Sequence, residues 1–154
     1  GNYDVVLAAD NHATAVIAAV PVTSITSKIY VSNGIAPITL PISATHIVSG
    51  TAILNPSSST EVAYVAARQT FNTAPIVTTN TVAADDLTGA YALTLPVAAP
   101  LLGTYSAMLP IAIAPQSGVA SLYTVEASAT GYSSQSANVD ISAADITQDF
   151  TLTP

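Results

Sequence analysis

The segment Leu122-Tyr-Thr-Val-Glu-Ala-Ser-Ala-Thr-Gly-Tyr132 decides the fold class of this chain. Its side chains alternate along the backbone, with Tyr123, Val125, Ala127 and Ala129 on one face and Thr124, Glu126, Ser128 and Thr130 on the other. A period of two is typical of a β-strand that buries one face. Gly131 suits the turn that follows. The segment therefore predicts a half-buried antiparallel strand.

The same kind of pattern recurs through the chain. β-Branched residues, prolines at segment ends and Gly or Asn turns return at short intervals, and helix signals are scarce. We expect an all-β protein, an antiparallel Greek-key β-sandwich. The expected strands are Tyr3 to Ala9, Ala15 to Val22, Ser27 to Ser32, Ile38 to Leu40, His46 to Asn55, Glu61 to Gln69, Ile76 to Val82, Ala90 to Leu95, Ser106 to Ile113, Leu122 to Thr130, Ser136 to Ile141 and Gln148 to Leu152.

One stretch also fits a helix. Ser58-Ser-Thr-Glu61 has the spacing of a capping box, so residues 59–70 could form a short helix. Alternation of Val62, Tyr64 and Ala66, together with the strand-rich surroundings, favours the strand.

We expect the core of the sandwich to be formed by apolar side chains from several of these strands. They are Val48, Ala52, Leu93, Leu95, Tyr123, Val125, Ala127, Val139, Ile141, Phe150 and Leu152.

Composition limits the classes of partner. Charged residues make up 7% of the 154 residues, against roughly 25% in ordinary globular domains. Lys28 and Arg68 are the two permanent cations, set against nine carboxylates. A nucleic acid or an anionic membrane surface needs a basic patch, so neither is an expected partner. A surface rich in hydroxyl groups suits an exported protein, and we expect an extracellular, cell-surface or periplasmic location.

The chain has no cysteine, so neither a disulfide framework nor a thiolate metal site is available. Pro, Thr, Ser and Asn interrupt the apolar stretches before they reach the ~18 residues of a membrane-spanning helix. We expect no membrane insertion of this chain.

An internal repeat suggests the domain organisation. The segment Asn2-Tyr-Asp-Val-Val-Leu-Ala-Ala-Asp-Asn-His12 matches Leu122 to Tyr132 at an offset of 120 residues, with tyrosine, valine and alanine in register. Thr39-Leu-Pro41 and Thr151-Leu-Thr-Pro154 then follow as similar endings. We predict that residues 1–41 are the closing strands of a preceding β-module, packed on a complete β-sandwich of residues 42–154. Strand edges leave room for homo-oligomers.

Four segments in order carry a family resemblance. They are Ser49-Gly-Thr51, Asp85-Asp-Leu-Thr-Gly-Ala-Tyr-Ala-Leu-Thr-Leu-Pro96, Tyr123 to Tyr132 and Asp149-Phe-Thr-Leu152. In this order they resemble a carboxypeptidase regulatory-like module, a transthyretin-like β-sandwich of secreted bacterial surface proteins and lipoproteins. The resemblance covers residues 42–154 and implies no catalytic residues. Residues 97–121 exceed the usual length, and we expect an extra hairpin or a protruding loop there.

The two histidines are the first candidates for chemistry. His12 follows Asp10 and Asn11, but Asp and Asn at a strand end usually bond the backbone of their own turn. His46 has no acidic neighbour in the sequence and is expected to be packed or solvated. A useful metal site needs three or more converging donors, so we expect no bound metal and no cofactor.

The acidic pair Asp85 and Asp86 lacks the spacing of a calcium loop, so a turn is expected there. Lys28 could form an isopeptide bond, but no partner strand is evident and an exposed lysine is the simpler expectation. None of the serines lies in a nucleophile elbow. We therefore expect no enzyme activity and no catalytic residue.

The tyrosines separate two function classes. Tyr3, Tyr91, Tyr123 and Tyr132 are expected in the sandwich core or at its corners. We expect a structural or interaction module, a spacer or adhesive domain that contacts protein or glycan at the cell surface. The alternative, a carbohydrate-binding module, needs coplanar exposed aromatic rings. Besides Phe150, the aromatics free for that role are Tyr30, Tyr64, Phe71 and Tyr105.

Overall fold

The computed structural model describes residues 1–21, 39–71, 74–85, 87–104, 114–115 and 122–154, and these form strands, turns and loops without a helix. The strands are β1 (Asn2–Leu7), β2 (Ala15–Pro21), β3 (Thr45–Leu54), β4 (Tyr64–Phe71), β5 (Ala74–Ala83), β6 (Ala90–Pro96), β7 (Leu101–Thr104), β8 (Ala114–Pro115), β9 (Leu122–Ser128), β10 (Gln135–Asp140), β11 (Ile146–Thr147) and β12 (Phe150–Leu152). The prediction of an all-β chain is confirmed.

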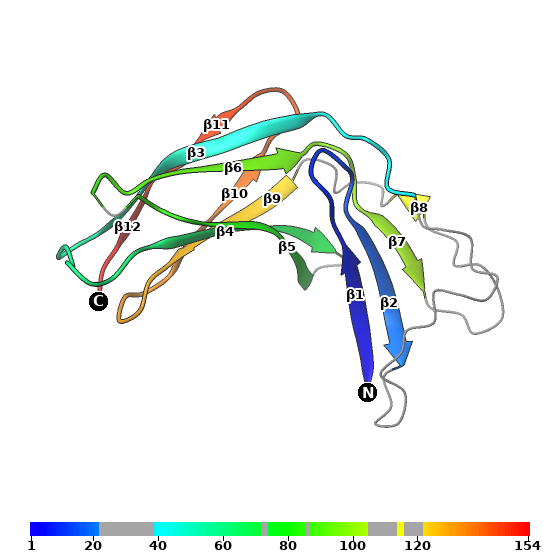
Figure 1. Cartoon of the computed structure of the whole chain (residues 1–154), viewed down its shortest axis with the longest axis horizontal. Helices are drawn as coiled ribbons and strands as arrows, with labels where there is room; N and C mark the ends of the chain where they lie inside the picture. Colours follow the sequence, from blue (N-terminus) through cyan, green and yellow to red (C-terminus); the bar gives the residue numbers. More distant parts are fainter. Residues whose placement is uncertain (22–38, 72–73, 86, 105–113, 116–121) are drawn as a thin grey trace.

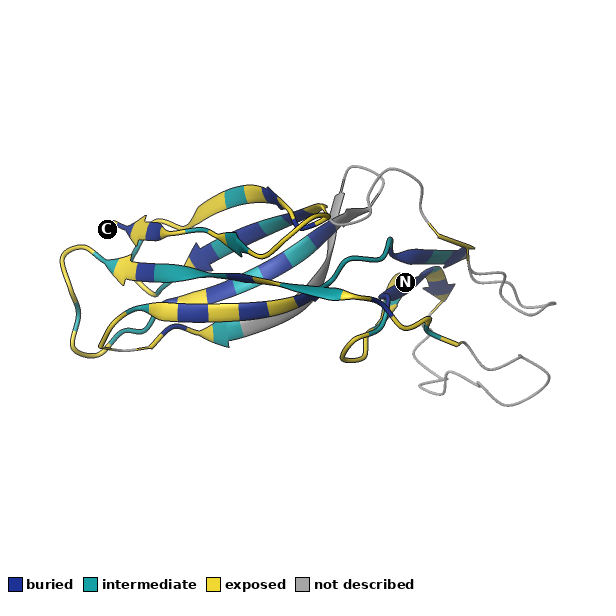
Figure 2. Cartoon of the chain, turned by 90° about the horizontal axis from the view of Figure 1, so that it is seen from above, coloured by how far each residue is buried: buried dark blue, intermediate teal, exposed yellow. Residues whose placement is uncertain are grey.

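Two sheets form a β-sandwich (Figure 1). One sheet has the antiparallel strand order β10-β9-β4-β5. In the other, β3 is central, with β6 antiparallel on one side and β11 and β12 parallel on the other. Along β6 and β9, buried side chains alternate with exposed or half-buried ones, as Figure 2 shows. The period-two pattern of the sequence thus places one face of each sheet in the core.

The core lies between the two sheets and contains all eleven side chains that we predicted for it. Leu93, Leu95, Val125, Ala127 and Ile141 have no exposed surface at all. Burying a large apolar side chain stabilises the fold by about 1.5 to 3 kcal/mol. In a chain without disulfides, this cluster is the main source of stability.

A third sheet, with strand order β1-β2-β7-β8, lies beside the sandwich (Figure 1). The antiparallel hairpin β1–β2 joins β7 through β2, in parallel, with Ala15 opposite Leu101. β7 and β8 pair antiparallel and belong to the segment 97–121, where we expected an extra hairpin or a loop. The segment inserted between β6 and β9 of the sandwich therefore extends the sheet of the N-terminal hairpin. The division of the chain at residue 41 stays a prediction.

Within residues 59–70 the structure has a strand and no helix, since β4 begins at Tyr64 and residues 59–63 are irregular. The Ser58 hydroxyl oxygen accepts the backbone N–H of Glu61 at 3.1 Å, as in a capping box, but no helix follows. Predicted strand ends differ from the observed ones by three residues at most. Three short strands, β7, β8 and β11, were not predicted.

Some predicted strands need correction or stay untested. Thr39 and Leu40 are not in a strand, although we expected one from Ile38 to Leu40. Gln148 and Asp149 are irregular, so the last strand begins only at Phe150. The strands expected at Ser27 to Ser32 and Ser106 to Ile113 lie outside the described residues.

Candidate functional site

The contact between the first and last strands of the sandwich concentrates the polar side chains that hold the fold. β11 and β12 run parallel to β3, with Ile146 opposite Val48 and Phe150 opposite Ala52. We call β3, β11, β12 and the residues that join them the seam. Between β11 and β12 the chain is irregular, and side chains replace part of the ladder there.

Two aspartates bind the backbone of β3 in the seam. Oδ1 of Asp149 accepts the N–H of Thr51 at 2.7 Å and the Thr51 hydroxyl at 3.0 Å. Oδ1 of Asp145 accepts the N–H of Ile47 at 2.9 Å. The two aspartates are four residues apart, and so are the two residues of β3 whose N–H groups they bind. The two side chains therefore hold β3 at two separate points along its length. Hydrogen bonds to an ionised acceptor are stronger than neutral ones.

His46 also lies at the seam, and its surroundings correct our expectation. The sequence shows no acidic residue near His46, but its Nδ1 is 3.1 Å from Oδ1 of Asp145. The Ile47 N–H, and then the His46 ring, hold the pKa of Asp145 below its usual value. Asp145 is 65% exposed at its side chain, so this contact is a surface tie and not a buried charge pair.

Two core tyrosines bind backbone carbonyls with their hydroxyl groups, one near the start of β6 and the other at its end. The Tyr123 hydroxyl donates to the Pro96 carbonyl at 2.6 Å, and burial raises its pKa. The Tyr91 hydroxyl donates to the Gln148 carbonyl at 2.5 Å. Burial, together with the nearby charge of Asp149, raises the pKa of Tyr91 to about 12. Both groups stay protonated and act as structural donors.

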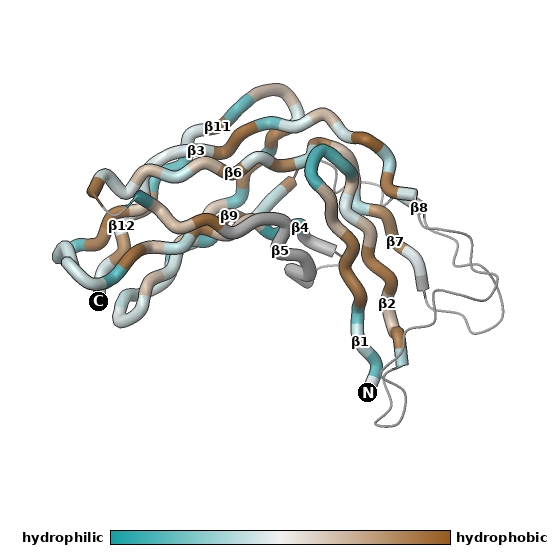
Figure 3. The backbone as a smooth tube through the Cα atoms, viewed as in Figure 1, coloured by the Kyte–Doolittle hydropathy of each residue, from teal (hydrophilic) through white to brown (hydrophobic). Residues whose placement is uncertain are grey.

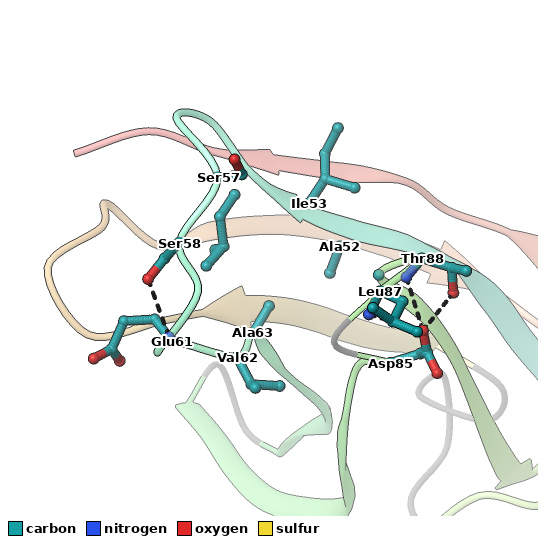
Figure 4. Close-up of a pocket in the computed structure, with 12 residues that line it drawn as sticks. Ala52, Ile53, Ser57, Ser58, Glu61, Val62, Ala63, Asp85, Leu87 and Thr88 are labelled. Atoms are coloured by element: carbon teal, nitrogen blue, oxygen red, sulfur yellow. Dashed lines mark hydrogen bonds between the residues drawn. The ribbon is translucent and has the colours of Figure 1, made fainter.

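A small cavity opens at the end of the sandwich, between the β3–β4 loop and the β5–β6 turn (Figure 4). Its volume is about 130 Å³, and Glu61 and Asp85 are the two carboxylates among its lining residues. Sites for small organic molecules usually measure about 300 to 1,000 Å³. This cavity is therefore too small for such a ligand.

Asp85 is committed to the turn beside this cavity, as the sequence predicted. Its Oδ1 accepts the Thr88 N–H at 2.7 Å, the Thr88 hydroxyl at 2.9 Å and the Leu87 N–H at 3.0 Å. The Thr88 groups, followed by the Leu87 N–H, lower the pKa of Asp85. Gly89 completes the turn at φ +69°. Asp86 lies outside the described residues.

His12 belongs to the β1–β2 turn, again as expected. Its Nδ1 lies 2.7 Å from the Asp10 carbonyl oxygen, and Asn11 adopts a left-handed φ of 58°. A second cavity of about 140 Å³ borders this turn. Among the described residues, no three His, Asp or Glu side chains come together as a metal site.

The aromatic residues arrange differently from the prediction at one position. Tyr91 and Tyr123 are buried, and Tyr132 packs against the core and donates to the Pro56 carbonyl. Tyr3, however, is 58% exposed, so its expected place in a core is wrong for this structure. Exposure of Tyr3 follows from the lack of a described sheet facing β1.

The aromatic residues that could form a sugar-binding platform give little support to the alternative of a carbohydrate-binding module. Tyr64 is exposed on the sandwich, and Phe150 is buried in its core. The side chains of Tyr30, Tyr105 and Phe71 lie outside what the structure describes, as does Lys28. Within the described part, Arg68 is the one permanent cation, and its Nη1 pairs with Glu126 Oε2 at 2.5 Å.

No family model matches this chain, and neither does any curated protein. Among the described residues, no helix has the length and apolar character to cross a membrane. Asp145 and Asp149 are the residues of the seam that sequence reasoning missed. Their partners lie 98 residues away in the chain, and no local pattern reveals such a contact.

Proposed function

We propose that this chain is a non-catalytic structural module of an exported bacterial protein, which acts as a spacer or adhesive domain at the cell surface. The seam carries the proposal. β3 opens the sandwich, β12 closes it, and the two strands are parallel neighbours. Tension between Ile42 and Pro154 would pull them in opposite directions along their axes. All bonds across the seam would then resist together.

The bonds across the seam are numerous for its length. Besides the aspartate contacts, Gln148 donates its N–H to Ser49 and Asn55 donates its N–H to Leu152, both at 2.8 Å. Shearing must stretch several of these bonds at once, whereas unzipping breaks them one after another. A domain that transmits force needs bonds that are loaded together in shear, and it does not need a ligand-binding cleft.

Composition supports a place outside the cytoplasm, because few charges and many hydroxyl groups suit an exported surface. The segments that resemble a carboxypeptidase regulatory-like module fall on neighbouring parts of one sandwich, at β3, at the turn before β6 and at β9. We include in the proposal that the strands of the sandwich are connected as a transthyretin-like Greek key. We also include that the module contacts protein or glycan at the cell surface.

Single-molecule force measurements test the proposal. The chain has no cysteine of its own, so handles can be attached at introduced cysteines. Ile42→Cys with Pro154→Cys loads the seam in shear. As the control, Leu54→Cys with Thr88→Cys loads the β3–β6 pair near one end, where antiparallel strands unzip.

We expect unfolding in the shear geometry to need several times the force of the unzipping geometry. Asp149→Ala should lower the shear force and leave the unzipping force nearly unchanged. Equal forces in the two geometries would remove the basis for a tension-bearing spacer.

A further inference from the structure

Next to their turns, the β1–β2 and β9–β10 hairpins have the same register at the offset of 120 residues. At a bulge between Tyr3 and Val5 the first hairpin then shifts by one residue, so that Tyr3 pairs with Val20 where Tyr123 pairs with Val139. In the first hairpin, Leu7, Val6 and Val5 pair with Ala15, Val16 and Ile17. In the second, Ala127, Glu126 and Val125 pair with Gln135, Ser136 and Ala137. The repeat seen in the sequence is therefore also a repeat of strand pairing.

The turns of the two hairpins agree as well. His12 donates its N–H to Ala9 at 3.1 Å, and Tyr132 donates its N–H to Ala129 at 3.2 Å. The residue before each donor has a left-handed φ, 58° at Asn11 and 79° at Gly131. Asn tolerates this conformation better than most residues, so it can replace glycine here.

The next segment also returns to each hairpin in the same way. Ala13 donates its N–H to Pro41 at 2.9 Å, and Ser133 donates its N–H to Thr153 at 2.7 Å. Pro41 and Thr153 each follow a Thr-Leu pair. The likeness thus extends beyond the hairpins to the segments that return to them, although only the second of these segments, β12, is a strand.

The surroundings of the two hairpins differ on one side. β9 pairs with β4 along the edge that faces away from β10, whereas β1 is the last described strand of its sheet. The two tyrosines at matching positions of β9 and β1 differ as well, since Tyr123 is 2% exposed inside the sandwich and Tyr3 is 58% exposed. Val5 and Leu7 are half-buried, although their equivalents Val125 and Ala127 are fully buried. Figure 3 shows the middle of β1 as apolar.

We propose that the edge of β1 that faces away from β2, which pairs with no described strand, is a docking site for one extended strand equivalent to β4, supplied by another β-sandwich module of the same kind. In the sandwich, Val65 lies opposite Ala127 and Gln69 lies opposite Tyr123. The same register would place the arriving strand opposite Leu7 and Tyr3. Its module would cover the exposed ring of Tyr3 as the sandwich covers Tyr123.

The inference rests on the proposed function as a structural module. It adds that two modules would join by pairing a strand of one with β1 of the other. β7 already extends the sheet of the β1–β2 hairpin on the β2 side. With a β4-like strand on the β1 side, the hairpin would be paired on both edges. An unpaired apolar strand edge is otherwise open to non-specific association.

An extended chain tests the proposal. A second copy of residues 42–120 is placed directly before Gly1, so that β1 and β2 can close it as β9 and β10 close the sandwich. Tyr3→Trp supplies a reporter, because the natural chain has no tryptophan. We expect the emission to shift to shorter wavelength, and acrylamide quenching to fall severalfold, relative to the same substitution in the unextended chain.

The matched control carries Val65→Pro and Ala67→Pro in the added copy alone, because proline cannot complete a strand ladder. This control should show neither the shift nor the protection. A peptide of residues 61–71, added to the unextended Tyr3→Trp chain, covers the case in which the added copy misfolds. Protection by the extension that the proline control abolishes, or protection by the peptide over a scrambled one, supports the proposal.

The proposal is overturned if neither the extension nor the peptide protects the reporter, or if the proline control protects it equally and the peptide does not. The force measurement on the unextended chain does not depend on this edge. Failure of the docking site and failure of the proposed function can therefore be told apart.

Discussion

Gly50 in β3 lies against the carbonyl oxygen of Gln148, so closely that a Cβ on Gly50 would be 2.1 Å from that oxygen. The carbon of the same carbonyl would be 2.7 Å away. Both are backbone atoms of the irregular stretch between β11 and β12, and they cannot move without breaking the Gln148 N–H bond to Ser49. The seam therefore closes only over a residue without a side chain.

We expect Gly50→Ala to destabilise the fold by about 3 kcal/mol or more, since overpacking usually costs ~1 to 3 kcal/mol and here the obstacle is backbone. Urea unfolding measures the change. Gly131→Ala is the control, because Gly131 has a left-handed φ of 79° but no atom within 4 Å of the added Cβ. Its cost should be about 1 to 2 kcal/mol. A larger loss at Gly131 than at Gly50 would contradict the close approach at the seam.

Leu95 has no exposed surface, and we expect Leu95→Ala to lower the free energy of unfolding by ~2 to 5 kcal/mol through the cavity that it leaves. Leu87→Ala removes the same atoms from a side chain that is 90% exposed. That control should change stability by less than about 0.5 kcal/mol. Similar melting temperatures for the two variants would be incompatible with the observed core.

Acid should weaken the seam through Asp145. Its pKa is lowered in the folded chain, so its ionised form stabilises the fold at pH values above the unfolded pKa near 4. This stabilisation is lost as the pH falls through the folded value. Asp145→Asn keeps an oxygen that can accept the Ile47 N–H but does not titrate. We expect melting temperatures below pH 4 to fall less steeply in this variant than in the natural chain, and identical slopes would refute the assignment.

Alkali should act through Tyr91, whose pKa rises from 10.0 to about 12 on folding. A raised pKa favours the protonated group in the folded state, so stability is present below pH 10 and is lost between about pH 10 and 12. In Tyr91→Phe the thermal midpoint should depend less on pH in this window. Tyr64→Phe, at an exposed ring, should follow the natural chain. The prediction fails if the two variants show the same pH dependence.

Removal of residues 1–41 should leave the sandwich folded, because its core cluster contains no residue from this segment. It should also expose the edge of β7 that pairs with β2. We expect a chain that begins at Ile42 to associate or aggregate, which light scattering after size-exclusion chromatography detects. A monomer with the full stability of the parent would show that the N-terminal hairpin is a dispensable tail.

The core strands could be predicted because their signal is local. The alternation of Tyr123, Val125 and Ala127 follows from the geometry of a strand, in which successive side chains point to opposite faces. The turns at Gly131 and Asp85 could be predicted for an equally local reason, since glycine adopts a left-handed φ and aspartate accepts hydrogen bonds from the backbone of its own turn. The strand β4 was harder to predict, because the Ser58 capping bond forms whether or not a helix follows.

The seam and the exposure of Tyr3 were decided by tertiary structure. Asp145 and Asp149 meet partners 98 residues away, and the pairing of β2 with β7 joins Ala15 to Leu101, which are also far apart in the chain. Tyr3 and Tyr123 stand in matching sequences, yet one is exposed and the other buried. Alternation sets which face of a strand a side chain occupies, but burial requires a second sheet against that face. Whether that sheet is present depends on the packing of the whole assembly and not on the strand's own residues.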